Sequence, residues 1–99
     1  MGDASAGIPL LYTGDALQIG ESGEAGTPNA HLWLSAENAS LMAENLCQAL
    51  SAALPGREAA LKANLEDLRA RLSALDAELR AGLSDLPRKG IVTFHEAFP

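Results

Sequence analysis

Eight leucines recur at steps of three and four residues in the second half of this 99-residue sequence, and no other feature restricts the fold as strongly. They are Leu61, Leu65, Leu68, Leu72, Leu75, Leu79, Leu83 and Leu86. This spacing is typical of one face of an α-helix. Acid-before-base pairs at i,i+4, such as Asp76–Arg80, add to helix stability. The pattern predicts a helix from about Gly56 to Ser84, roughly 28 residues and about 42 Å long.

A shorter helix is predicted before it. Ser35 is a suitable N-cap, and Glu37 would complement the helix dipole in the first turn. The apolar positions that follow have helical spacing; they are Ala39, Met42, Ala43, Leu46, Leu50 and Ala53. Pro55–Gly56 should end this helix near Leu54 and allow a sharp change of direction.

The remaining segments predict little regular structure. Ile91-Val92-Thr93-Phe94 is expected to form a short, buried, parallel strand. Residues 8–12 could be a short strand or a pinned loop end, and Thr13 to Ala30 should form a surface loop. The predicted fold class is therefore mainly α, with two helices, the second long, plus a short strand. Because a lone strand edge leaves backbone groups unpaired, we expect the chain to be a piece of something longer.

Composition and charge exclude several classes of protein. The net charge is −6 and the pI about 4.7, which argues against a nucleic-acid partner. Residues 1–56 hold six acids and no Lys or Arg, so an acidic surface is expected there. The single cysteine, Cys47, excludes an internal disulfide and is expected to pack as a small apolar side chain. The first residues lack a secretory signal, so the protein is either cytosolic or has lost its leader.

The two histidines, His31 and His95, are the candidate functional residues. Each lies at the end of a predicted element, where binding groups tend to occur, and neutral imidazole is a good ligand for zinc. A lone histidine at such a junction is more often a capping or packing group, and this pair lacks the short spacing of a zinc finger. The sequence contains no phosphate-binding loop and no nucleophile elbow.

Two histidine segments, with two helical segments between them, resemble segments of a known protein family. The first is Asn29-Ala30-His31-Leu32-Trp33 and the second is Phe94-His95-Glu96-Ala97-Phe98. Between them, Met42 to Leu46 and Ala63 to Leu79 are also similar to the family. The chain resembles the periplasmic zinc- or manganese-binding proteins of bacterial metal-uptake ABC transporters, as a partial chain. The resemblance is strong over residues 29–98.

The resemblance implies a bilobed α/β solute-binding protein whose lobes are joined by one rigid helix. Residues 1–54 would be the end of the first lobe with its acidic loop, 55–87 the interlobe helix, and 88–99 the start of the second lobe. His31 and His95 would be metal ligands, and His95 favours zinc over manganese. The family site needs another histidine and a carboxylate, so the site is incomplete in these 99 residues.

The resemblance also implies an extracytoplasmic or periplasmic location, an ABC importer permease as partner, and no enzymatic activity. The alternative from the residues is a helical-hairpin interaction module without metal, based on the leucine spacing. A metal-dependent hydrolase is a third and weaker hypothesis, because no general base accompanies either histidine. In both leading hypotheses the uncovered leucines predict a homo-oligomer.

Overall fold

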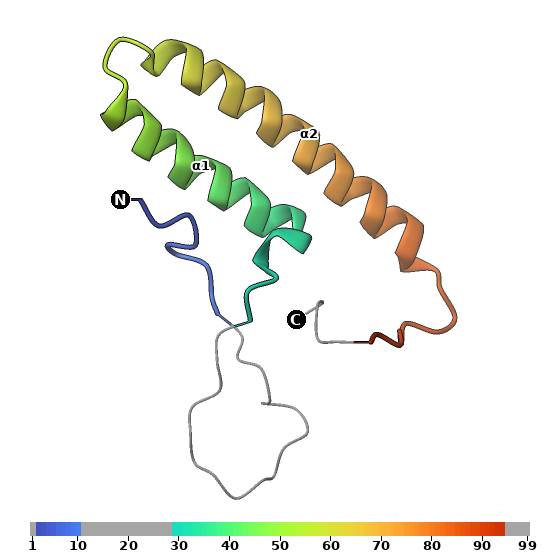
Figure 1. Cartoon of the computed structure of the whole chain (residues 1–99). Coiled ribbons are helices and arrows are strands. Elements are labelled where there is room, and N and C mark those ends of the chain that lie inside the picture. The colour runs from blue at the N-terminus through green and yellow to red at the C-terminus, as the bar shows by residue number, and fades with distance from the viewer. Residues whose placement is uncertain (1, 11–28, 95–99) are drawn as a thin grey trace, which may run out of the picture.

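Two antiparallel helices dominate the structure, a computed structural model that describes residues 2–10 and 29–94 (Figure 1). The short 3-10 helix η1 (Leu32–Leu34) leads into α1 (Ala36–Ala53), and a tight turn connects α1 to α2 (Glu58–Ser84). The two predicted helices are confirmed, and their observed ends lie within two residues of the predicted ones. Because the hairpin is antiparallel, the chain before α1 and the chain after α2 leave it at the same end.

The start of α1 follows the capping pattern that the sequence predicts. The Ser35 hydroxyl accepts a hydrogen bond from the Asn38 backbone N–H at 3.3 Å, and Glu37 lies in the first turn. These groups satisfy one of the exposed N–H donors of the first turn and complement its positive dipole end. At the other end the Leu54 N–H donates to the Leu50 carbonyl at 2.8 Å.

The turn between the helices depends on Gly56, whose φ of +87° is in the left-handed region that favours glycine. The Gly56 N–H donates to the Glu58 carboxylate at 2.9 Å. Glu58 therefore caps the turn. Further along α2, the expected Asp76–Arg80 pair is present, with 2.7 Å between Nε and Oδ2.

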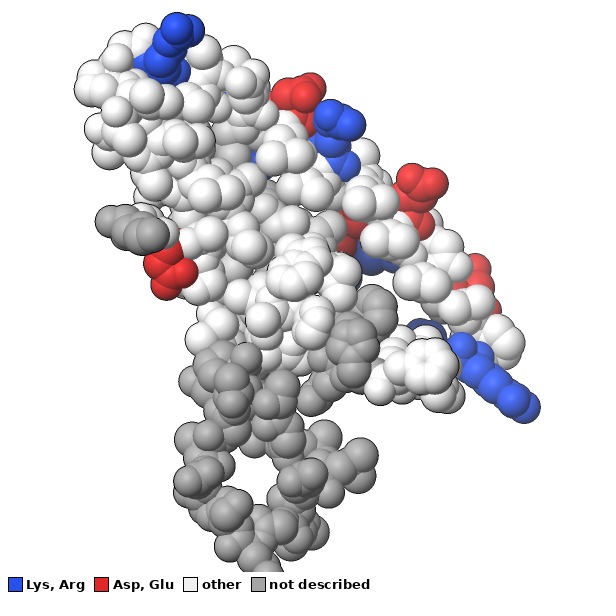
Figure 2. All heavy atoms as spheres, viewed as in Figure 1, with Lys and Arg blue, Asp and Glu red and all other residues white. Residues whose placement is uncertain are grey.

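The leucine face of α2 is only partly covered by α1. Leu61, Leu65 and Leu72 are half-buried, whereas the exposed fraction of Leu68 is 42% and that of Leu83 is 55%. With 18 residues, α1 is too short to cover the 27 residues of α2. Figure 2 shows acidic and basic side chains interspersed along α2, so this helix combines an open apolar face with a charged one.

An N-terminal segment packs alongside α1 (Figure 1). The Asn45 side-chain amide donates to the carbonyls of Ala4 and Ala6, both at 2.9 Å. Ile8 is 6% exposed, which makes it one of two buried apolar side chains in the described part of the chain. The sequence allows either a short strand or a pinned loop end for residues 8–12. In the structure, residues 8–10 form no strand and match the pinned loop end. The rest of that patch, and residues 13–28 of the predicted loop, lie outside the described residues.

The strand predicted over residues 91–94 is wrong for this structure. These residues have no strand conformation, and Val92 and Phe94 are fully exposed where burial was expected. A strand requires a neighbour to pair its backbone N–H and C=O groups, and the segments 2–10 and 29–94 provide none. Propensity alone therefore does not make this segment a strand.

Hydropathy does not indicate a transmembrane helix among the described residues. Over the described ranges, neither helix is both long and apolar enough to cross a bilayer.

Candidate metal centre

His31 lies in a turn that its neighbour Asn29 organises. The Asn29 side-chain oxygen Oδ1 accepts the His31 backbone N–H at 3.0 Å and contacts the His31 ring nitrogen Nδ1 at 2.8 Å. An Asn oxygen that accepts the N–H two residues later forms an Asx turn. Asn29 is only 4% exposed, so this turn is held by a buried polar side chain.

The two hydrogen bonds together define the tautomer of His31. A backbone N–H can only donate, so the Asn29 atom that receives it must be the amide oxygen and not the amide nitrogen. That oxygen can only accept, so Nδ1 must carry a hydrogen. In the neutral imidazole the lone pair is then on Nε2, which is the atom that can coordinate a metal ion.

The residues after His31 fix its surroundings. Leu32 is buried and begins η1, and the Ser35 N–H donates to the Leu32 carbonyl at 3.4 Å. Trp33 is 54% exposed, whereas Leu32 beside it is buried, so Leu32 is the side chain that packs. The Trp33 and His31 rings lie 5.4 Å apart between centroids at an angle of 47°, which leaves a half-buried imidazole next to an indole.

The second predicted ligand, His95, lies outside the described residues. Within residues 2–10 and 29–94, no group of three or more His, Cys, Asp or Glu side chains is arranged to hold a metal ion. His31 is thus the predicted ligand whose geometry the structure gives, and its pairing with His95 stays a prediction. Cys47 is half-buried on α1.

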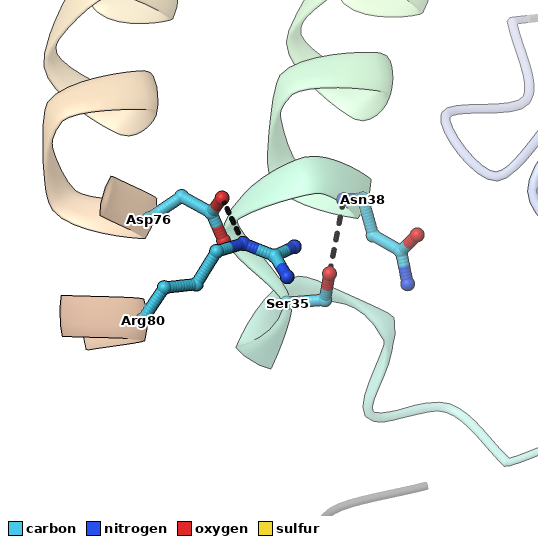
Figure 3. Close-up of polar contacts among 4 residues, drawn as sticks. All are labelled: Ser35, Asn38, Asp76 and Arg80. Atoms are coloured by element: carbon cyan, nitrogen blue, oxygen red, sulfur yellow. Dashed lines mark hydrogen bonds and ion pairs between the residues drawn. The ribbon is translucent and has the colours of Figure 1, made fainter. Parts of the chain in front are cut away.

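An open groove between α1 and α2 contains the other cluster of charged groups. Its lining includes Glu37, Glu66, Arg69, Asp76 and Arg80. The hydrogen bond and negative charge of Asp76 raise the pKa of Arg80 above its ordinary value, and Glu37 adds to this shift. Figure 3 shows the Asp76–Arg80 pair of α2 beside the Ser35–Asn38 cap of α1.

Two of the carboxylates in and near this groove are paired with arginines. Besides the Asp76–Arg80 pair, Arg69 reaches Glu44 of α1 at 3.7 Å. Such opposite-charge contacts across exposed helix surfaces contribute little to stability. Among the described residues, the carboxylates of this groove form no group of three that could hold a metal ion, so His31 is the stronger candidate.

Two asparagines with structural roles were not identified from the sequence. Asn29 belongs to the first histidine motif, and its position two residues before His31 is the spacing of an Asx turn, which is the signal for its role as the partner of His31. Asn45 gave no signal, because its hydrogen bonds join residues about forty positions apart.

The sequence matches a family model over residues 2–99. The model is described as zinc-uptake complex component A, periplasmic. The match includes the whole of both helices and both histidine segments.

Comparisons with individual relatives agree with the family match. The chain is 35% identical over 68 residues to the high-affinity zinc uptake system protein ZnuA of Haemophilus ducreyi, covering 69% of this chain and 22% of the relative. It is 36% identical over 78 residues to the zinc-binding protein AdcA of Streptococcus pyogenes serotype M3, covering 79% and 15%. With the manganese ABC transporter substrate-binding lipoprotein PsaA of Streptococcus mitis, the identity is 31% over 96 residues, covering 95% and 29%. The chain thus spans less than a third of the length of these relatives.

Proposed function

This chain belongs to the family of periplasmic zinc-uptake components, and we propose that it takes part in binding zinc outside the cytoplasm and in delivering it to the permease of an ABC importer. It binds its cargo and catalyses no reaction. His31 supplies one ligand through Nε2, and His95 supplies a second. Because two ligands cannot complete a tetrahedral site, the remaining ligands must come from other residues or molecules.

The observation that carries this proposal is the geometry of His31. Its ring is half-buried, and Asn29 holds the tautomer that leaves the lone pair on Nε2. Metal-binding histidines characteristically donate their other ring N–H to an oxygen acceptor. A histidine that served only for packing would not require a buried amide oxygen directed at both its backbone and its ring.

The antiparallel hairpin supports a meeting of the two histidine segments. His31 precedes α1, and the chain leading to His95 follows α2, so both leave the hairpin at the same end (Figure 1). The nine residues by which α2 exceeds α1 extend it by about 14 Å. Residues 85–94 can span up to about 33 Å when extended, which is sufficient for a return to η1.

In this proposal α2 is the rigid element between two lobes. Residues 1–54 belong to the first lobe, 55–87 form the linking helix and 88–99 begin the second lobe. The continuous helix from Glu58 to Ser84 supports this division, because 27 residues in one helix are more than twice the average in globular proteins. Zinc is favoured over manganese because imidazole nitrogen suits zinc, whereas manganese prefers hard oxygen donors.

Zinc titration of the complete protein that carries this sequence tests the proposal. We expect His31→Ala and His95→Ala each to weaken zinc affinity by more than the roughly 10- to 100-fold that is typical for loss of an outer-shell partner. Gln48→Ala, an exposed change on α1, is the matched control and should leave the affinity unchanged. Unchanged zinc affinity in both histidine variants would reject the assignment.

A further inference from the structure

We infer that Asn29 is a positioning residue for zinc, which sets the tautomer and the direction of the His31 ring through Oδ1. The inference rests on the proposed function, in which His31 is a ligand. It goes further by assigning a role to a residue that does not touch the metal ion. The Asn29 oxygen lies 2.8 Å from Nδ1 of His31 and 3.0 Å from its backbone nitrogen.

The geometry gives Asn29 two effects on one ligand. The contact with Nδ1 keeps the hydrogen on that nitrogen and so directs the lone pair to Nε2. The contact with the backbone N–H fixes the peptide from which the ring projects. Together they hold both the backbone that carries the side chain and one edge of its ring, so the ring is orientated before a metal ion arrives. A preorganised ligand loses less rotational freedom on binding.

Burial makes this arrangement difficult to replace with water. Asn29 is 4% exposed, and Leu32 beside it is also buried. Removal of the amide oxygen would leave the Nδ1–H donor of a half-buried ring without this partner, which carries a desolvation cost. The ring could avoid that cost by rotating or by moving the hydrogen to Nε2. Either change would take the lone pair away from the metal-binding direction.

Three variants separate positioning from a purely structural role. Asn29→Leu keeps the approximate volume and removes the acceptor, whereas Asn29→Asp keeps an oxygen at the same position. A carboxylate accepts from the same two donors and strengthens the basicity of a ligating histidine. Asn29→Asp should therefore rescue what Asn29→Leu loses. His31→Ala reports whether the histidine is a ligand at all.

Nitrogen NMR of the metal-free full chain is the first measurement, because it reports which ring nitrogen carries the hydrogen and does not depend on zinc. The chain has two histidines, so His95→Ala leaves the His31 signals assigned without ambiguity. At about pH 8, above the pKa of free histidine, we expect the Nδ1–H tautomer in the unmodified protein and in Asn29→Asp. In Asn29→Leu we expect a mixture with the Nε2–H tautomer.

Zinc affinity of the complete protein is the second measurement. Asn29→Leu should lose about 10- to 100-fold, while Asn29→Asp should stay within a few-fold of the unmodified protein. An Nε2–H tautomer of His31 in the unmodified protein would overturn the inference, even if Asn29→Leu failed to fold. An Asn29→Leu variant with normal helix content, the original tautomer and the original affinity would also overturn it.

The same data separate this inference from the proposed function. If His31→Ala binds zinc normally while Asn29→Leu still changes the tautomer, the proposed function fails and the control of the tautomer stands. If His31→Ala loses zinc while Asn29→Leu changes neither measurement, the positioning role fails alone.

Discussion

Asn45 ties the N-terminal segment to α1 by two hydrogen bonds, and Asn45→Ala should loosen this attachment. The Asn45 amide donates two hydrogen bonds of 2.9 Å, to the carbonyls of Ala4 and Ala6. No other side chain among the described residues is shown to hold this segment to α1 by hydrogen bonds. We therefore expect local detachment of residues 2–10 and not unfolding of the hairpin.

The magnitude follows from these two contacts. A typical hydrogen bond contributes about 0.5–1.5 kcal/mol net, so the two give about 1–3 kcal/mol. Alanine is the better helix former by up to about 0.7 kcal/mol, which offsets part of the loss. The expected net cost is roughly 1–2 kcal/mol, equivalent to a change of about 5- to 30-fold in the population of the detached state.

Amide hydrogen exchange measures this population directly. The Ile8 N–H donates to the Ser5 carbonyl at 3.1 Å within the attached segment, so its exchange rate should rise by the same 5- to 30-fold. Asn45→Asp should show at least as large an effect, because a carboxylate has no donor for the two carbonyls. Gln48→Ala, exposed on the same helix, is the matched control. Equal Ile8 exchange rates in Asn45→Ala and Gln48→Ala would refute the reasoning.

Two further predictions concern α2. Backbone N–H groups of Glu58 itself and Gly56 lower the pKa of the Glu58 carboxyl below its ordinary value. A carboxyl with a lower pKa in the folded state adds stability above its unfolded-state pKa, and this stability is lost as the pH falls through the folded-state value. Glu58→Gln should therefore flatten the acid limb of a urea-unfolding series below about pH 4.5. Separately, the exposed leucines predict self-association, so the unmodified chain should sediment as a dimer or larger species at high concentration and Leu68→Asp should weaken this; a monomer throughout would contradict it.

The helices were predictable because their determinants are local. Ser35 and Gly56 mark the ends of α1 and the turn after it, and the spacing of the leucines requires no knowledge of distant residues. The 91–94 segment illustrates the opposite case. Its β-branched and aromatic residues favour a strand, but a strand forms only where a neighbouring strand exists, and the described residues contain none. The exposure of Leu83 agrees with the expectation of uncovered leucines, because a shorter α1 cannot cover the whole of α2.

In the candidate site, too, some features depend on neighbouring residues and others depend on distant ones. The Asn29–His31 arrangement is local, since an Asx turn spans three residues and brings the ring to the same oxygen as the backbone N–H. Its tautomer follows from these neighbouring groups without any information on the rest of the fold. The proposed approach of His31 to His95 would depend instead on the chain reversal between α1 and α2, which makes the segments before α1 and after α2 leave the hairpin at one end. A histidine can thus be prepared as a ligand by its immediate sequence, whereas the metal ion it binds depends on ligands that only the long-range fold can supply.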